Sequence, residues 1–121
     1  MKIQESAENY LETILTLSQQ KPNVRSIDIV NELNFSKPSV SVAMKNLREN
    51  GYIKMDGNGF ITLTPSGLAI AEKIYERHTL LSQWLISLGV DEQTAQEDAC
   101  RMEHVISSAS FEAIKKHAGR E

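Results

Sequence analysis

A thiol, a carboxylate and an imidazole lie close together near the C-terminal end of the chain, at Cys100, Glu103 and His104. If this stretch is helical, the spacing i, i+3 and i+4 places all three side chains on one face within about one turn. Sulfur, oxygen and nitrogen donors together suit a transition-metal ion such as iron, cobalt, nickel or zinc. The triplet therefore predicts a metal site, although Cys100 taken alone is more typical of a small core residue.

The composition is that of an ordinary globular protein. The chain has 121 residues, of which 40% are hydrophobic and 24% are charged, which fits one core with a helical extension. It contains no apolar run of the length that a membrane span needs, and its N-terminus lacks the apolar core of a signal peptide. A single cysteine cannot form an internal disulfide. These features predict a cytoplasmic protein with no membrane partner.

The first part of the chain is predicted to form two helices. Apolar residues recur at three- and four-residue steps over 6–19, which indicates one amphipathic helix, and the segment 21–23 with its proline ends it. Ser26 is predicted to cap a shorter second helix. The side chains predicted to face inward from this second helix are Ile27, Val30 and Leu33.

Ser36 is predicted to cap a third helix that runs to about Asn50. Pro38 falls in its first turn, where no intrahelical hydrogen bond is lost, and Gly51 provides the stop. The side chains predicted to face inward are Val40, Ala43, Met44 and Leu47.

The apolar pattern changes to a period of two after Gly51. The runs 52–55 and 60–63 read as strands, and the Asp-Gly-Asn-Gly sequence over 56–59 is a strong hairpin turn. Helices followed by a hairpin in this order predict a winged helix-turn-helix that binds DNA. The alternative is a small α+β core with no DNA role.

In a winged helix-turn-helix, the third helix enters the major groove and turns its polar face to the base edges. Ser39 can hydrogen-bond a base or a phosphate, whereas Pro38 and Val42 can contact thymine methyl groups. The net charge is −3, but the segment 37–54 carries four cations against one anion, which suits phosphate contacts. The full set predicted to contact DNA, including the wing, is Ser36, Lys37, Pro38, Ser39, Val42, Lys45, Arg48, Lys54 and Asn58.

Three more helices are predicted after the hairpin. Thr64 and Pro65 begin a long one that runs to about Leu88, the second starts at 90–91 and carries the metal triplet, and a short one covers 108–116. The predicted apolar stripe of the long helix is interrupted by one histidine and comprises Ile70, Ile74, His78, Leu81, Leu85 and Leu88.

Several spaced motifs together resemble the DtxR/MntR family of metal-activated transcriptional repressors. These motifs are Ala7-Glu8-Asn9-Tyr10-Leu11-Glu12, Ser36-Lys37-Pro38-Ser39-Val40, Leu63-Thr64-Pro65-Ser66-Gly67, Arg77-His78 and Ala99-Cys100-Arg101-Met102-Glu103-His104. The resemblance extends over about 5–116 and is to the two-domain form, without the SH3-like domain of longer members. It implies a mainly α fold with a small β-hairpin wing: a winged helix-turn-helix DNA-binding domain over 1–64, then a helical metal-binding and dimerisation domain over 65–121.

The resemblance also implies metal ligands on three helices. By motif position these ligands are Asn9, Glu12, His78, Cys100, Glu103 and His104. Asn9 departs from the family pattern, which typically has methionine there in iron regulators and aspartate in manganese regulators. Cys100 follows the iron type, whereas Glu12 follows the manganese type. Ser82 and Gln96 stand where iron regulators place a second-site glutamate and histidine.

This mixed donor set leads to an expected preference for Fe(II), then Mn(II), then Zn(II). The expected function is that of a repressor, and not an enzyme, in which metal binding promotes DNA binding and thereby controls metal-ion homeostasis. The resemblance implies a homodimer on double-stranded DNA with a pseudo-palindromic operator. The dimer surface is expected to include Leu80, Trp84, Leu88 and the apolar face of 90–106.

Three alternatives remain open on the sequence alone. A winged-helix regulator could respond to an organic ligand or to oxidation of Cys100 rather than to a metal. A small metalloenzyme could use three protein ligands and an open coordination position to activate water. A structural or adaptor protein would bind neither metal nor operator DNA.

Overall fold

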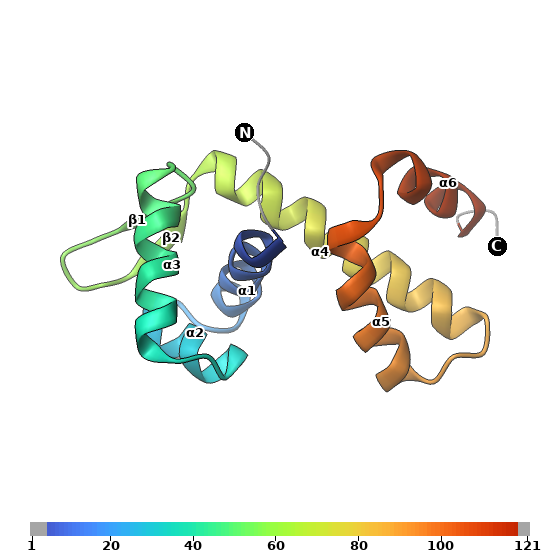
Figure 1. Cartoon of the computed structure of the whole chain (residues 1–121), viewed down its shortest axis with the longest axis horizontal. Helices are drawn as coiled ribbons and strands as arrows, with labels where there is room; N and C mark the ends of the chain where they lie inside the picture. The colour runs from blue at the N-terminus through green and yellow to red at the C-terminus, as the bar shows by residue number, and fades with distance from the viewer. Residues whose placement is uncertain (1–4, 119–121) are drawn as a thin grey trace. The chain divides into compact units, whose positions relative to one another are not determined.

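The computed structural model describes residues 5–118 and consists there of six helices and one two-stranded sheet (Figure 1). The elements in chain order are α1 (Glu5–Gln20), α2 (Ser26–Leu33), α3 (Lys37–Glu49), β1 (Ile53–Met55), β2 (Ile61–Leu63), α4 (Pro65–Ser87), α5 (Glu92–Val105) and α6 (Ser108–Ala118). The chain divides into two compact units, 1–72 and 73–121, and α4 contributes to both. None of the helices over 5–118 is long and apolar enough to cross a membrane.

The predicted class, mainly α with a small β-hairpin, is confirmed. Strands β1 and β2 are antiparallel, with Lys54 opposite Thr62 at the centre of the pairing. The turn between them is held by the carboxylate of Asp56, which accepts hydrogen bonds from the backbone N–H groups of Asn58 and Phe60 at 2.9 and 3.0 Å. This Asx-type turn is the structure that the Asp-Gly-Asn-Gly sequence predicts.

The first unit has one apolar core, to which α1, α2, α3 and both strands contribute. The predicted inward face of α3 is confirmed, because Val40, Met44 and Leu47 are buried and Ala43 packs against them. Burying this stripe leaves the opposite face of α3 in solvent. The largest fully buried side chains of the unit are Leu11, Ile14, Val24, Ile29, Val40, Met44 and Ile53.

The start and the inward face of α2 differ from the prediction. The N-cap residue is Arg25 rather than Ser26, and its backbone N–H donates to the Asp28 carboxylate at 2.8 Å. Ile29 is fully buried, whereas Ile27, which was predicted to face inward, is 43% exposed. A helix of two turns with several apolar positions can bury more than one face. Packing against α1 and α3 selects the face that contains Ile29.

The hairpin is tied to the beginning of α4 by a close backbone contact. The Thr64 N–H donates to the Tyr52 carbonyl at 3.0 Å, and the Thr64 hydroxyl donates to the Gly51 carbonyl at 2.6 Å. The same hydroxyl accepts from the Gly67 N–H at 3.2 Å, which caps α4 as the Thr-Pro sequence predicts. Gly67 lies directly against the Tyr52 carbonyl, where a Cβ atom would clash with the carbonyl oxygen.

The second unit has a smaller core formed by α4, α5 and α6. Its buried members are Leu81, Ala99 and Phe111, one from each helix. Helix α5 begins as predicted, because the Asp91 side chain accepts from the Thr94 N–H at 3.0 Å. Leu88, predicted to belong to the apolar stripe of the long helix, follows the end of α4 and is 60% exposed.

We expect Gly67→Ala to destabilise the protein. Alanine would gain about 1 kcal/mol of helix propensity, but the added methyl group meets rigid backbone, and overpacking of this kind costs about 1–3 kcal/mol. Chemical denaturation followed by circular dichroism should show a lower free energy of unfolding. Gly57→Ala is the matched control, because a Cβ atom there meets nothing within 4 Å; equal stabilities for both variants would contradict the expectation.

We expect Asp28 to stabilise the start of α2 in a pH-dependent way. The hydrogen bond from Lys21, and then that from the Arg25 backbone, lowers the pKa of Asp28 below its ordinary 3.8. Because the folded-state pKa is depressed, the stabilisation is present above about pH 4 and is lost as pH falls through the lowered pKa. Asp28→Asn should therefore cost about 0.5–1 kcal/mol at neutral pH and nothing in strong acid.

Urea denaturation at a series of pH values measures this difference. Glu32→Gln, an exposed change on the same helix, is the control. A stability gap between wild type and Asp28→Asn that stays constant down to about pH 2 would contradict the assignment.

Candidate metal centre and nucleic-acid interface

A fully buried carboxylate, that of Glu103, lies between two histidines in the second unit. The Nδ1 atom of His78 on α4 is 2.9 Å from Oε2 of Glu103, and the Nε2 atom of His104 on α5 is 3.3 Å from Oε1. The shorter contact orients the His78 ring, as a carboxylate partner orients a metal-binding histidine.

The helices position these groups through their buried faces. Ala95, Ala99 and Glu103 recur at four-residue steps and are all buried, so the carboxylate continues the apolar face of α5. His78 likewise lies between Ile74 and Leu81 on the buried face of α4, as the interrupted stripe predicts. Both groups therefore point into the unit because their neighbours in the same stripes must be buried.

The two oxygens of the buried carboxylate differ, because His104 approaches Oε1 at an ion-pair distance of 3.3 Å that is not a hydrogen bond. Within the described part of the chain, Oε1 of Glu103 accepts no hydrogen bond. Burying an ionised carboxylate costs several kcal/mol unless its charge and lone pairs are compensated. Two imidazoles and one carboxylate are a donor set for divalent transition metals. The residues present therefore fit a metal ion, and Glu103 is the group that most requires one.

The other predicted ligands are placed as follows. Cys100 is exposed on α5. Asn9 and Glu12 are half-buried on α1 of the first unit, where the Asn9 backbone carbonyl accepts from the Thr13 hydroxyl at 2.8 Å. The roles of all three as ligands stay predictions.

The residues predicted to contact DNA lie on α3, its cap and the hairpin, and all of them are exposed. Ser36 caps α3 as predicted, because its hydroxyl accepts from the Ser39 N–H at 3.3 Å. It also donates to the Ser39 hydroxyl at 2.8 Å, so the Ser39 proton can be directed outward. Val42 is 60% exposed, so its side chain is accessible for contact with a thymine methyl group.

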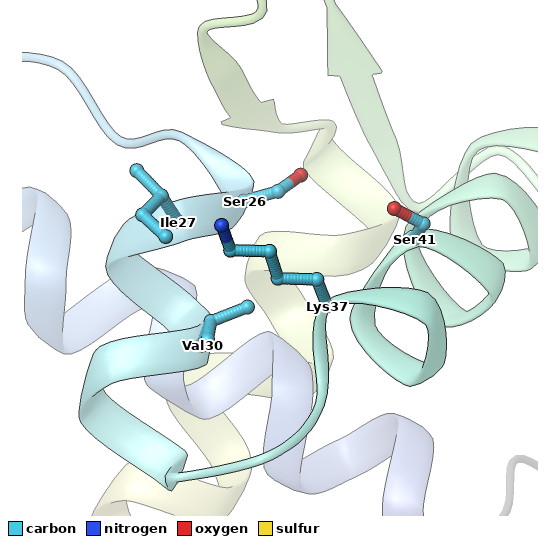
Figure 2. Close-up of a pocket in the computed structure, with 5 residues that line it drawn as sticks. All are labelled: Ser26, Ile27, Val30, Lys37 and Ser41. Carbon is cyan, nitrogen blue, oxygen red and sulfur yellow. The ribbon is translucent and has the colours of Figure 1, made fainter.

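Sequence reasoning missed an open groove between α2 and α3 that adjoins this surface (Figure 2). Figure 2 shows the hydroxyls of Ser26 and Ser41 on opposite sides of the groove and the Lys37 side chain extending toward Ile27 and Val30. Hydroxyl and ammonium groups of this kind bind phosphate oxygens. The sequence analysis did not indicate the groove, because it placed Ile27, one of the lining residues, in the core.

The comparisons with known proteins identify the family of the chain. Residues 2–59 match the family model for the iron dependent repressor, N-terminal DNA binding domain, and residues 64–120 match that for the iron dependent repressor, metal binding and dimerisation domain. The chain is 33% identical over 110 residues to the transcriptional regulator MntR of Salmonella typhimurium, covering 91% of this chain and 70% of that protein. An HTH-type transcriptional regulator of Methanocaldococcus jannaschii is 34% identical over 113 residues, covering 92% and 90%.

Solved structures show the same arrangement of elements. The manganese regulator SloR superposes with a TM-score of 0.83 at 25% identity, over 100% of this chain and 56% of SloR. A manganese-dependent transcriptional repressor in complex with manganese superposes with a TM-score of 0.86 at 27% identity, over 93% of this chain and 52% of that protein. The chain thus spans about half the length of these two proteins.

The two family models follow one another along nearly the whole chain, and MntR is related over most of its own length. The predicted fold, a winged helix-turn-helix followed by a helical domain, is therefore confirmed. The family resemblance inferred from the spaced sequence motifs is confirmed as well. The chain belongs to the DtxR/MntR family of metal-dependent transcriptional repressors.

Proposed function

We propose that this chain is a metal-activated transcriptional repressor that acts in the cytoplasm to control metal-ion homeostasis. The observation that carries the proposal is the buried Glu103 carboxylate between His78 and His104. Glu103 and the two imidazoles would hold a divalent cation, which would balance the charge of the carboxylate. The same chain presents an exposed recognition helix, so a metal signal and a DNA-binding surface occur in one molecule.

The proposed ligands are His78, Glu103 and His104, together with Cys100, Asn9 and Glu12 from the family motifs. We propose the order Fe(II), then Mn(II), then Zn(II). The Cys100 thiolate supports the softer Fe(II) ion, whereas Glu12 and the two manganese-regulated structural relatives support Mn(II). Asn9 offers only a neutral amide oxygen, so it is the weakest of the proposed ligands.

The proposed DNA partner is a double-stranded, pseudo-palindromic operator bound by a homodimer. On each protomer, the cations Lys37, Lys45 and Arg48 of α3 would neutralise phosphates, while Pro38 and Val42 would contact bases. From the wing, Lys54 and Asn58 would reach a neighbouring phosphate or the minor groove. The groove formed by Ser26, Lys37 and Ser41 extends the phosphate-binding surface onto α2.

Metal binding and DNA binding are coupled in this proposal. If the metal raises the affinity for the operator by some factor, the operator raises the affinity for the metal by the same factor. The proposed dimer surface lies near the end of α4. Leu80 and Trp84 pack partly against the core of the second unit, and Ile86 and Leu88 are exposed.

A second candidate is a regulator that responds to oxidation of Cys100, because this thiol is exposed on α5. In that case Cys100→Ser would abolish the response to oxidant, and a chelator would leave DNA binding unchanged. The metal proposal requires the opposite result with the chelator.

We expect Glu103→Gln to abolish metal-stimulated DNA binding without unfolding the protein. The amide keeps the shape of the side chain and removes a buried charge, so the melting temperature without metal should not fall. The affinity for metal should fall by more than the roughly 10- to 100-fold that loss of an outer-shell partner costs. The stimulation is measured by anaerobic fluorescence anisotropy with DNA from the region upstream of the protein's own gene. Fe(II), Mn(II) and Zn(II) are titrated separately into the protein–DNA mixture at fixed salt.

Glu97→Gln, an exposed change on the same helix, is the control and should respond to metal like wild type. Undiminished stimulation of the Glu103→Gln variant would refute the proposed metal centre.

We expect Lys45→Ala and Val42→Ala to weaken DNA binding in different ways. Loss of a phosphate contact weakens binding to all sequences and reduces the slope of log K against log salt by about 1. Loss of a thymine contact instead lowers the affinity for the operator more than that for random DNA. Anisotropy at several salt concentrations distinguishes the two effects, with Lys73→Ala in the second unit as the control. Identical salt slopes in Lys45→Ala and wild type would remove Lys45 from the interface.

A further inference from the structure

A buried arginine holds the joint between α5 and α6. Arg77 on α4 is 6% exposed, and its Nη1 atom donates to the carbonyls of Glu103 and Ile106, both at 3.0 Å. Its Nη2 atom donates to the Ser108 hydroxyl at 3.3 Å. The guanidinium carbon lies 5.4 Å from the centre of the Phe111 ring, which is within cation–π range. One side chain thus contacts the last turn of α5, the connection and the first turns of α6.

Consecutive residues of α4 hold Glu103 at two points. Arg77 binds its backbone carbonyl, and His78 contacts its carboxylate at 2.9 Å. The first contact fixes where the backbone of α5 passes, and the second fixes the rotamer of the side chain. Together they leave the carboxylate little freedom.

The chemistry of arginine suits this position. Glu103 belongs to the last turn of α5, and the final carbonyls of a helix lack intrahelical donors and carry its negative dipole end. A planar guanidinium can donate to two carbonyls and a hydroxyl at once, which an ammonium group cannot do in the same geometry. The Arg77 guanidinium therefore binds backbone carbonyls and the Ser108 hydroxyl, and not the Glu103 carboxylate.

We propose that Arg77 is a positioning residue of the metal centre. By fixing the end of α5 against α4, it holds Glu103 and His104 in the geometry that receives the ion. Through Ser108 and Phe111 it also ties the beginning of α6 to the same geometry. This inference rests on the proposed metal-activated function.

A purely structural role for Arg77 gives a different expectation. If Arg77 only stabilised the fold, any substitution with an equal loss of stability would affect the centre equally. A suitable comparison is Ile114→Ala, because Ile114 packs on the core of the second unit from α6 and makes none of the Arg77 contacts.

The experiment uses the full chain and four proteins: wild type, Arg77→Lys, Ser108→Ala and Ile114→Ala. Three quantities are measured: the melting temperature without metal, the Kd for Mn(II) by calorimetry, and the ¹⁵N signals of the His78 ring in the metal-free protein. Ser108→Ala removes one hydrogen bond at an exposed residue. The Ser108→Ala variant therefore still tests the role of the Arg77 contacts if the Arg77→Lys variant fails to fold.

We expect Arg77→Lys to weaken Mn(II) binding by about 10- to 100-fold, as loss of an outer-shell partner does. It should also shift the His78 ring signals before any metal is added, and Ser108→Ala should shift them less in the same direction. Ile114→Ala should lower the melting temperature but change the Kd by no more than about twofold, as expected for a site outside the network.

Equal changes in Kd and in His78 signals for Arg77→Lys and Ile114→Ala would overturn the inference. Wild-type protein that binds no Mn(II), Fe(II) or Zn(II) would refute the proposed function instead. Even then the metal-free His78 signals decide whether Arg77 positions the Glu103–His78 pair: signals that stay unchanged in both Arg77→Lys and Ser108→Ala overturn this, and signals shifted in both support it.

Discussion

The burial of the Glu103 carboxylate is the constraint on which the second unit depends. A negative charge without access to water costs several kcal/mol, so the surrounding elements must compensate for it. His78 contacts one oxygen at 2.9 Å and His104 the other at 3.3 Å, while Arg77 holds the backbone of the same residue. The remaining deficit at Oε1 is what a divalent cation would compensate. A bound cation would therefore act at the residue that also joins α4 to α5.

The first unit is held together by an apolar core, which leaves the polar face of α3 in solvent. The described core of the first unit is built from apolar side chains, to which Tyr10 and Thr13 add hydroxyl groups. Because α3 is held through its buried stripe, its serine, lysine and arginine side chains face solvent in a rigid row. The contact between Gly67 and the Tyr52 carbonyl fixes the hairpin to α4. The residues predicted to contact DNA thus lie on a helix that the apolar core holds in place.

Local signals were sufficient for most of the fold. Ser36 with Pro38, Thr64 with Pro65, and Asp91 are cap signals that act within one turn, and each begins a helix where predicted. The Asp56 turn acts within four residues and forms as expected. Where the local pattern was ambiguous the prediction failed: Ile27 and Ile29 are both apolar, and only packing against the other helices decides which one is buried.

The sequence by itself determined the order of the elements, the family and the residue types that can bind a metal, because caps, turns and spaced motifs depend on neighbours in the chain. Only the tertiary structure decided that Glu103 is buried between two imidazoles and that Arg77 holds its carbonyl from 26 residues away. Such contacts join α4 to α5 and depend on how two helices pack. The spacing of residues along each helix indicates which face is buried, but not which residues of the other helix that face meets, so the contacts of the Glu103 carboxylate became visible only in three dimensions.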